Sequence, residues 1–278
     1  MRGPVDTLAL NLRMTKRLAR RPATLVERLG ALDERLVFVI GSPRSGTTFL
    51  AGAIGAVPGF VDLGEVAPLK AAVPRLAGAS EIVAAGALRK ILGRARRFGL
   101  VGSVRAVEQT PEMAYLADAA AVVFPDARFV HIVRDGRDVV CSLLERGWLG
   151  AGRTGGADDA GLSYGVDARF WVEPERRAEF GTVSEARRAA WAWRCYVSAA
   201  RAARCDVYEL RYEALAADPA AVAIELAAYL GCASEPLARG LAAVHRDSIG
   251  RFRRDLGAEQ LADVEVEAGV LLAELGYS

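Results

Sequence analysis

Apolar and polar positions alternate along this chain with two different periods. Short apolar runs bounded by turn residues predict buried strands at 36–40, 58–64, 103–107, 127–133 and 206–210. Apolar positions at helical spacing predict a helix after residue 45, two or three helices within 66–98, and further helices at 111–124, 134–148, 184–204, 219–230 and 259–276. This alternation predicts an α/β fold of three layers, in which a mostly parallel central sheet is flanked by helices.

Two segments fall outside the regular alternation. Residues 1–34 are rich in Arg and predict an N-terminal helical extension, which leaves 35–278 as a single domain. Residues 149–166 are rich in Gly and polar residues, and we expect a mobile substrate loop over 149–182. The sequence shows no internal repeat.

Composition and charge narrow the classes of partner. The 36 Lys and Arg residues nearly balance the 34 Asp and Glu residues, so we expect no nucleic-acid partner. No apolar run approaches the ~20 residues of a membrane span and the N-terminus lacks a signal-peptide core, so we expect no stable membrane insertion and a cytoplasmic location. A basic N-terminal helix that touches a membrane surface stays open. The cysteines form no CxxC pair and the histidines lack metal-ligand spacing, so we expect reduced thiols and no metal.

The stretch VFVIGSPRSGTTFLAGAI (37–54) has the layout of a strand, a loop of small residues and a helix. The backbone N–H groups of such a loop and of the helix N-terminus form a cradle for an anion. The spacing from Gly41 to Gly46 equals that of a nucleotide-triphosphate loop, but Thr47 stands where such loops carry Lys. The cation lies upstream at Arg44 instead, which suits an anion that is less charged than a triphosphate with Mg²⁺.

A second anion site is predicted from VRDGRDVVCSLLER. Arg134 ends a predicted strand, and Ser142 and Arg146 are four residues apart on one face of the following helix. Because the Arg side chain offers a planar fork for phosphate oxygens, these three side chains together suit one phosphate group.

These motifs resemble those of a known family. The motif PRSGTT resembles the 5′-phosphosulfate loop of sulfotransferases that use 3′-phosphoadenosine 5′-phosphosulfate (PAPS). The version with Arg is similar to tyrosylprotein sulfotransferases and their bacterial relatives. The resemblance implies a P-loop-like fold and a loop that holds the 5′-phosphate and the sulfuryl group, with Arg44 facing the transferring group. The residues that match this loop are Arg44, Ser45, Gly46, Thr47 and Thr48.

The resemblance extends to three further segments. Arg134 and Ser142 resemble the family's 3′-phosphate site, and Arg146 matches an additional arginine of the tyrosylprotein type. In LRYEALAADP the resemblance implies that Tyr212 contacts the nucleotide. The segment DSIGRFRRDL (247–256) is similar to the one that closes over the cofactor, with Ser248 and Arg251 as its candidate contacts.

The general base is expected to be Glu65, which follows the predicted strand at 58–64 and matches the glutamate of tyrosylprotein-type relatives. His131 is the rival, since other family members use histidine, but it lies inside an apolar strand and is expected to be buried and hydrogen-bonded. His245 is a weaker rival. Gln109 stands where relatives often have a lysine that reaches the sulfate, so either its amide donates a hydrogen bond there or the charge comes from elsewhere.

These observations together predict a PAPS-dependent sulfotransferase that sulfates an acceptor hydroxyl and releases adenosine 3′,5′-bisphosphate. The acceptor is expected to be a small metabolite, a natural product or a glycan, in a pocket walled by 66–108 and 149–182. A homodimer is suggested by analogy alone. Two alternatives remain: a nucleotide-dependent kinase or phosphotransferase with a degenerate loop, and a nucleotide-binding module without activity.

Overall fold

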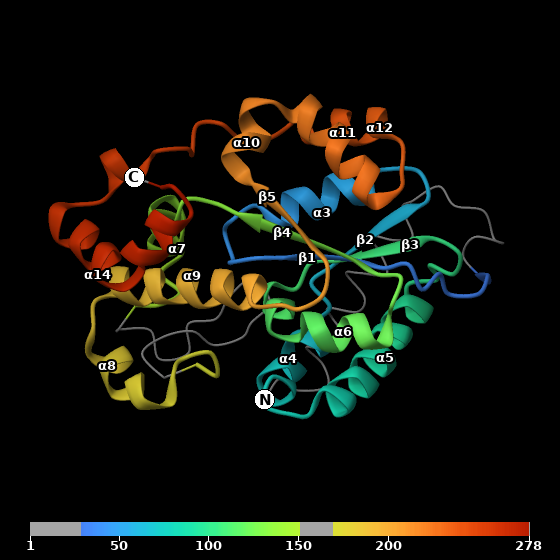
Figure 1. Ribbon diagram of the computed structural model, residues 1–278, viewed down its shortest axis with the longest axis horizontal. Helices are drawn as coiled ribbons and strands as arrows, with labels where there is room; N and C mark the ends of the chain where they lie inside the picture. The colour runs from blue at the N-terminus through green and yellow to red at the C-terminus, as the bar shows by residue number, and fades with distance from the viewer. Residues whose placement is uncertain (1–28, 151–168, 278) are drawn as a thin grey trace.

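Five parallel strands form one sheet at the centre of the computed structural model, which describes residues 29–150 and 169–277 (Figure 1). The strand order is β2–β3–β1–β4–β5, and every neighbouring pair is parallel. All five strands lie where the sequence pattern predicts them, and the α/β fold class is confirmed. Their bounds are β1 (Val37–Ile40), β2 (Phe60–Gly64), β3 (Arg105–Glu108), β4 (Arg128–Val133) and β5 (Val207–Arg211).

Helices cover both faces of the sheet, which gives the three predicted layers (Figure 1). One face carries α3 (Thr47–Gly55), α10 (Tyr212–Ala217), α11 (Pro219–Leu230) and α12 (Ser234–Leu241). The other carries α4 (Ala67–Leu76), α5 (Glu81–Phe98), η1 (Pro111–Leu116), α6 (Ala117–Val123) and α9 (Glu185–Arg201).

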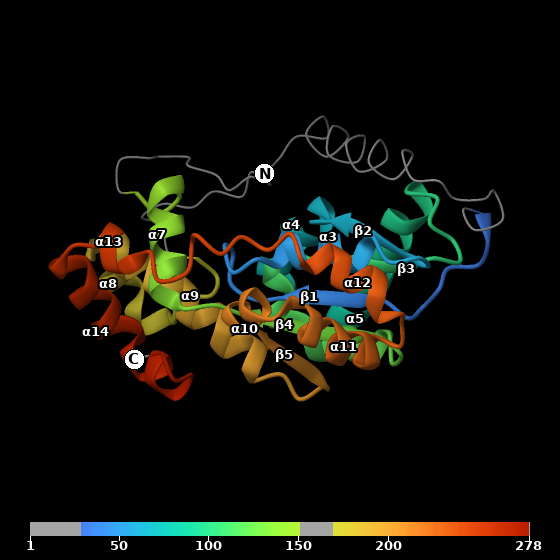
Figure 2. The ribbon, with the colours of Figure 1, turned by 90° about the horizontal axis from the view of Figure 1, so that it is seen from above.

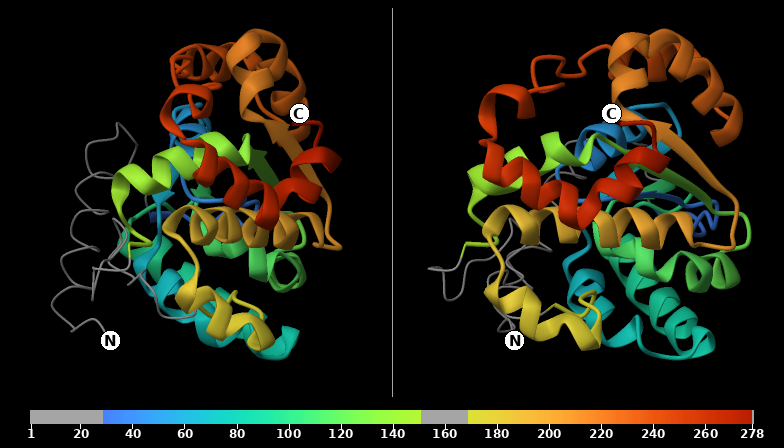
Figure 3. Two further views of the ribbon diagram at one scale, coloured as in Figure 1. Left: turned by 90° about the vertical axis from the view of Figure 1, so that its left-hand side faces the viewer. Right: turned by 60° about the vertical axis from the view of Figure 1, so that its left-hand side comes forward.

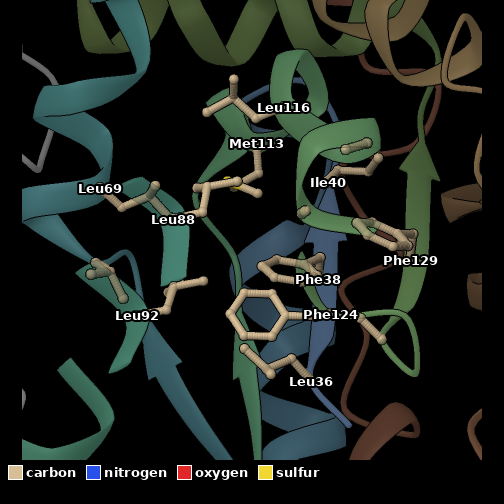
Figure 4. Packing of buried hydrophobic residues seen from close by; sticks show 14 of the residues in the cluster. Leu36, Phe38, Ile40, Leu69, Leu88, Leu92, Met113, Leu116, Phe124 and Phe129 are labelled. Carbon is tan, nitrogen blue, oxygen red and sulfur yellow. The ribbon is translucent and has the colours of Figure 1, made fainter. Parts of the chain in front are cut away.

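The central strand β1 is buried on both faces, as expected for a strand between two helical layers. Alternate side chains of a strand point to opposite faces, so Val37 and Val39 join one core while Phe38 and Ile40 join the other. In the second core the ring of Phe38 stacks on that of Phe129 at 5.1 Å between centroids, and Phe124 packs beside them (Figure 4).

A further group of helices lies beyond the carboxyl ends of the strands. It comprises α7 (Gly136–Arg146), η2 (Pro174–Arg176), α8 (Arg177–Thr182), α13 (Phe252–Asp255) and α14 (Ala258–Glu274). In Figure 3, α14 runs alongside α9 in this region. The fully buried side chains of Trp191, Trp193 and Tyr196 on α9 form much of this third core.

Two segments differ from the expectations. The predicted helix at 111–124 begins as the 3₁₀ helix η1 and continues as α6. Part of the expected loop at 149–182 is helical instead, because η2 and α8 occupy 174–182 and bury the ring of Phe180 against Trp171. The rest of that loop, 151–168, and residues 1–28 of the N-terminal extension lie outside the described residues.

Ion pairs fasten α14 to η2 and α9. The Glu267 side chain on α14 is 1% exposed and accepts hydrogen bonds from Arg176, Arg187 and Arg194. The guanidinium carbon of Arg176 also lies 3.7 Å from the ring centroid of Trp191, which adds a cation–π contact. This network holds α9, whose Trp193 donates its indole N–H to the carbonyl of Arg134 at 3.0 Å.

We expect Glu267→Ala to lower the free energy of unfolding by about 2–3 kcal/mol, because it removes the shared buried acceptor of three partly exposed guanidinium groups. Urea denaturation measures this value. Glu274→Ala, an exposed position near the end of the same helix, is the control and should change stability by less than about 0.5 kcal/mol. Equal effects of the two substitutions would contradict a central role for the network.

Candidate active site

The parallel sheet brings the carboxyl ends of all five strands to one end of the sheet, its carboxyl edge. Ligands of open α/β sheets bind at this edge, just beyond the strand ends. Residues that are far apart in the sequence therefore arrive together. They are the loop 41–46 after β1, Glu65 after β2, Gln109 after β3, Arg134 after β4 and Tyr212 after β5.

The loop after β1 has a backbone that few sequences could adopt. Its φ angles are 146° at Gly41, 72° at Arg44 and 100° at Gly46, all in the region that favours glycine. Gly46 is the N-cap of α3 and has no side chain that could bind the first N–H groups of the helix. These N–H groups lack partners within the helix, so the end of α3 presents donors and a partial positive charge.

Close packing against Tyr212 fixes the end of this loop. A Cβ atom added to Gly46 would lie 2.9 Å from two carbons of the Tyr212 ring and 3.3 Å from Cδ1 of Ile132. Gly46 is therefore required both by its φ angle and by the ring that lies against it.

A cavity of about 350 Å³ lies in front of the loop. It includes most of the residues that the sequence assigned to the two anion sites and to the C-terminal segment, and three that the sequence did not single out as binding residues, Phe49, Glu145 and His245. The full lining is Arg44, Gly46, Thr47, Thr48, Phe49, Arg134, Ser142, Glu145, Tyr212, His245, Ser248 and Arg251.

The two predicted anion sites touch each other inside this cavity. Nε of Arg44 in the loop donates a hydrogen bond to Oγ of Ser142 on α7 at 3.0 Å. Arg146, four residues beyond Ser142, is not part of the cavity lining, and its guanidinium carbon lies 6.0 Å from the ring centroid of Trp148. The helix thus presents Ser142 and Glu145 to the cavity, whereas the sequence suggested Ser142 and Arg146.

Arg134 is held by groups from four segments. Its side chain is 7% exposed, and its guanidinium donates to the carbonyl oxygens of Arg44 and Ser248. Nη2 lies 3.8 Å from Oδ2 of Asp138, and the guanidinium carbon is 4.8 Å from the ring centroid of Tyr212. The predicted nucleotide contact Tyr212 therefore forms a wall that packs against both Arg134 and the loop.

Two buried polar atoms at this site have no hydrogen-bond partner among the described residues. They are Nε of Arg134 and Oγ of Ser45. Ser45 is fully buried in the loop and is not part of the cavity lining, although its backbone N–H donates to the carbonyl of Ser42 at 3.1 Å. Because buried polar atoms normally have partners, both atoms are compatible with a polar ligand at this site.

The segment from His245 to Phe252 closes one side of the cavity. The hydroxyl of Tyr212 donates to the carbonyl of His245 at 2.7 Å, which fixes the start of the segment. At its end, the buried carboxylate of Asp138 accepts the N–H groups of Gly250 at 2.7 Å and Phe252 at 3.1 Å. Figure 2 shows this connection running from α12 to α13 beside α7. Burial raises the pKa of Asp138, while these two N–H groups oppose the shift.

Arg251 lines the cavity but is already paired. Its guanidinium donates to both carboxylate oxygens of Glu145 and, at 2.7 Å, to Asp255. The bond to Glu145 raises the pKa of Arg251, and the same bond lowers the pKa of Glu145. Glu145 could have been identified from the sequence, since it lies three residues after Ser142 and so on the same helix face.

Glu65 lies outside the cavity lining, and a series of hydrogen bonds connects its segment to α3, the helix that follows the loop. Its Oε2 is 2.7 Å from Nζ of Lys70, and its side chain is 27% exposed. The next residue, Val66, donates its N–H to Glu108 at 3.4 Å. Beside Glu108, Gln109 accepts a hydrogen bond from the Thr48 hydroxyl at 3.2 Å. The structure thus places Gln109 against α3, between the loop and the Glu65 segment.

The rival His131 is buried within the sheet. It is 1% exposed, and its Nδ1 lies 3.2 Å from Oε2 of Glu209 on the neighbouring strand β5. The expectation of a buried, hydrogen-bonded histidine is confirmed.

Two searches of the described residues gave negative results. In residues 29–150 and 169–277, no group of three or more His, Cys, Asp or Glu side chains is placed to hold a metal ion. Within the same ranges, no helix has both the length and the apolar character needed to cross a membrane.

A family model described as "Sulfotransferase family" matches residues 83–236, which is more than half of the chain. The chain belongs to the sulfotransferase family. The matched segment contains Arg134, Ser142 and Tyr212 and begins after the loop of β1. A search of curated proteins found no match to this sulfotransferase.

Solved structures of sulfotransferases share the fold. The sulfotransferase domain of the curacin biosynthetic pathway is 15% identical and aligns with a TM-score of 0.52 over 89% of this chain and 99% of its own. The domain from the Synechococcus olefin synthase is 15% identical, with a TM-score of 0.51 over 87% and 95%. A Mycobacterium avium sulfotransferase is 13% identical, with a TM-score of 0.51 over 98% and 86%.

Gly46→Ala should destabilise the sulfotransferase by about 1–3 kcal/mol, since it adds both backbone strain and a contact with Tyr212. Gly52→Ala is the matched control, because a Cβ there meets nothing within 4 Å and the position lies inside α3. That control should raise stability by about 0.5–1 kcal/mol. Denaturant unfolding of both variants measures the difference, and the same sign for both would contradict the required loop geometry.

Proposed function

We propose that this sulfotransferase uses PAPS as its donor, transfers the sulfuryl group to an acceptor hydroxyl and releases adenosine 3′,5′-bisphosphate. The observation that carries the proposal is the single cavity in which Arg44 and Ser142 meet at 3.0 Å. A ligand with two separate anionic groups on one nucleoside suits two anion sites that adjoin in one cavity.

The wall formed by the loop and α3 suits the 5′-phosphosulfate. The N–H groups at the start of α3 and the hydroxyl of Thr47 are donors for its oxygens, whereas the Thr48 hydroxyl donates to Gln109 and would have to release it first. Arg44 supplies the positive charge, and the partnerless Oγ of Ser45 is compatible with a further contact. These donors would stabilise the charge that develops on the leaving phosphate oxygen.

The adjoining part of the cavity suits the 3′-phosphate. Arg134, Ser142, Ser248 and Arg251 contribute to it, and the buried, partnerless Nε of Arg134 supports a bound anion there. Arg146 is not part of the cavity lining, so its side chain would have to move to contribute to this phosphate.

The transfer itself needs a base. The acceptor oxygen forms a bond to sulfur, the bond from sulfur to the phosphate oxygen breaks, and the electron pair stays on the phosphate. We assign the acceptor proton to the carboxylate of Glu65, a role that typically contributes ~10²–10⁴-fold. His131 is bound to Glu209 inside the sheet and is not placed to take this proton, whereas His245 lines the cavity; we keep Glu65, by analogy with the tyrosylprotein type.

A kinase or phosphotransferase is the second candidate, and the loop gives it little support. Thr47 occupies the position of the lysine that contacts outer phosphates in triphosphate loops. Lys70 is engaged by Glu65 and Glu112, at 2.7 and 3.6 Å, so its ammonium is already paired.

The acceptor, the domain organisation, the cellular location and the oligomeric state are also part of this proposal. We infer a small metabolite, natural product or glycan as the acceptor, a single domain over 35–278, a cytoplasmic location and a homodimer. The four cysteines are free, which is compatible with a reducing compartment.

The proposal predicts that the protein binds adenosine 3′,5′-bisphosphate more tightly than adenosine 5′-monophosphate or ATP–Mg²⁺. Isothermal titration calorimetry measures the three affinities. Arg134→Ala should weaken bisphosphate binding roughly ten- to hundredfold, since a charge-assisted phosphate contact contributes about 1.5–3 kcal/mol.

The control for this titration is Arg254→Ala, which removes the same charge from a side chain that is 77% exposed on the nearby α13. It should change bisphosphate affinity by less than about threefold. Equal or tighter binding of ATP–Mg²⁺ by the wild-type protein would contradict the sulfotransferase proposal and favour the kinase.

Glu145→Gln should tighten bisphosphate binding by up to about fivefold. The substitution removes a negative charge from the anion cavity and releases Arg251 from a pair whose carboxylate is 58% exposed and thus partly screened. Calorimetry with adenosine 5′-monophosphate, which lacks the 3′-phosphate, should show a smaller change. Unchanged or weaker bisphosphate binding would show that Arg251 does not exchange Glu145 for the ligand.

A further inference from the structure

A buried lysine joins Glu65 to a second carboxylate. Lys70 on α4 is 4% exposed, and its Nζ lies 2.7 Å from Oε2 of Glu65 and 3.6 Å from Oε1 of Glu112. Glu112 in η1 is fully buried and also accepts a hydrogen bond from the hydroxyl of Tyr196 on α9 at 3.1 Å. These contacts form a row of four side chains, Tyr196, Glu112, Lys70 and Glu65. The row runs from α9 through η1 and α4 to the end of β2.

The far end of this row is rigid. The Tyr196 ring is fully buried and makes an edge contact with Tyr115 at 5.5 Å between centroids. Its hydroxyl therefore holds the carboxylate of Glu112 in one place, and Glu112 in turn holds the ammonium of Lys70. In contrast, the Glu65 side chain is 27% exposed, so the row ends at a carboxyl group that solvent and ligands can reach.

We propose that Lys70 is a positioning residue for Glu65 and that Lys70 and Glu112 together set the proton affinity of the Glu65 carboxyl. The inference deepens the proposed function, on which it rests, because it gives the general base a supporting pair of charges. The arrangement follows the general logic of a base that is oriented by a second group, which is itself oriented by a third.

The positional part follows from burial. A lysine with 4% exposure cannot exchange its carboxylate partners for water without a large desolvation penalty. It therefore restrains Oε2 of Glu65, and the orientation of the carboxyl group towards the edge of the sheet is defined by that contact.

The charge part explains why two carboxylates surround one lysine. Lys70 alone would stabilise the ionised form of Glu65 and make it a weak base. The negative charge of Glu112 opposes this effect and so favours proton uptake by Glu65. After Glu65 takes the acceptor proton, Lys70 is still paired with Glu112, and no unpaired charge is left in the buried site.

Glu108 is the other acidic group that faces Glu65 among the described residues. It is fully buried and accepts hydrogen bonds from the backbone N–H groups of Thr110 and Val66. Burial raises the pKa of Glu108 to about 8, with a smaller contribution from the charge of Glu65. Burial therefore favours the neutral form of Glu108, and Lys70 and Glu112 are the charged groups whose effect on Glu65 the variants below test.

The test is a pH titration of the Glu65 carboxyl in protein labelled with [5-¹³C]glutamate, in which Glu65→Gln identifies its carbon resonance. In Lys70→Met the loss of the cation destabilises the carboxylate, so the titration midpoint should move to higher pH. In Glu112→Gln the loss of the anion stabilises the carboxylate of Glu65, so its midpoint should move to lower pH. Each shift should be about one pH unit or more, a tenfold change in proton affinity.

Opposite movements support the inference, and general damage to the fold would not produce them. Lys70→Arg is a further variant for the case in which Lys70→Met or Glu112→Gln folds poorly. It keeps the charge and should leave the midpoint within about half a pH unit of the wild-type value. Movement of both midpoints in one direction, or of neither, overturns the inference.

Calorimetry with adenosine 3′,5′-bisphosphate separates this outcome from failure of the proposed function. The donor cavity does not include Lys70 or Glu112, so both variants should bind the bisphosphate within about threefold of wild type. If the wild-type protein does not bind it, the proposed function fails even if the two midpoints move apart. If the wild-type protein binds it and the midpoints do not move, the inference alone fails.

Discussion

The parallel pairing of the five strands is the constraint on which the candidate site depends. Because every strand ends at the same edge, the loop after β1, Arg134 and Tyr212 are delivered to one cavity by segments up to 171 residues apart in sequence, from Gly41 to Tyr212. Had one strand been antiparallel, its terminal residue would lie at the opposite edge of the sheet. The helices then fill both faces, and α7 with the segment from His245 to Phe252 completes the cavity.

Around this edge the protein places its charges in two arrangements. The cavity beside α3 is dominated by arginines, which are fixed by carbonyl groups, the Tyr212 ring and Glu145. The end of β2 is dominated by carboxylates, of which Glu65 and Glu112 share Lys70. An anion-binding wall next to the carboxyl group that we propose as the base matches what sulfuryl transfer needs, since the donor must be bound and the acceptor deprotonated.

Much of the fold was predictable because local patterns determine it. The β1 run LVFVI is apolar on both faces, Gly41 and Gly46 bracket a loop with positive φ angles, and Gly231 ends α11 with a φ of 63°. The split of 111–124 into η1 and α6 was not predicted, because its apolar positions also fit one continuous helix. The helical turn at 177–182 was not predicted either, because it depends on the packing of Phe180 against Trp171. Arg146 lies on the predicted helix but is not part of the cavity lining, because helical spacing gives a face and not the side chains that reach a cavity.

The sequence by itself determined where the strands lie, the glycines that bracket the loop 41–46 and the residue types of the two predicted anion sites, because each depends on neighbours within a few positions. Only the tertiary structure decided which of these residues meet. The contact of Arg44 with Ser142 spans 98 residues, and Tyr196 reaches Glu112 across 84. Such contacts are set by the packing of whole helices, and no local pattern records which side chains that packing brings together.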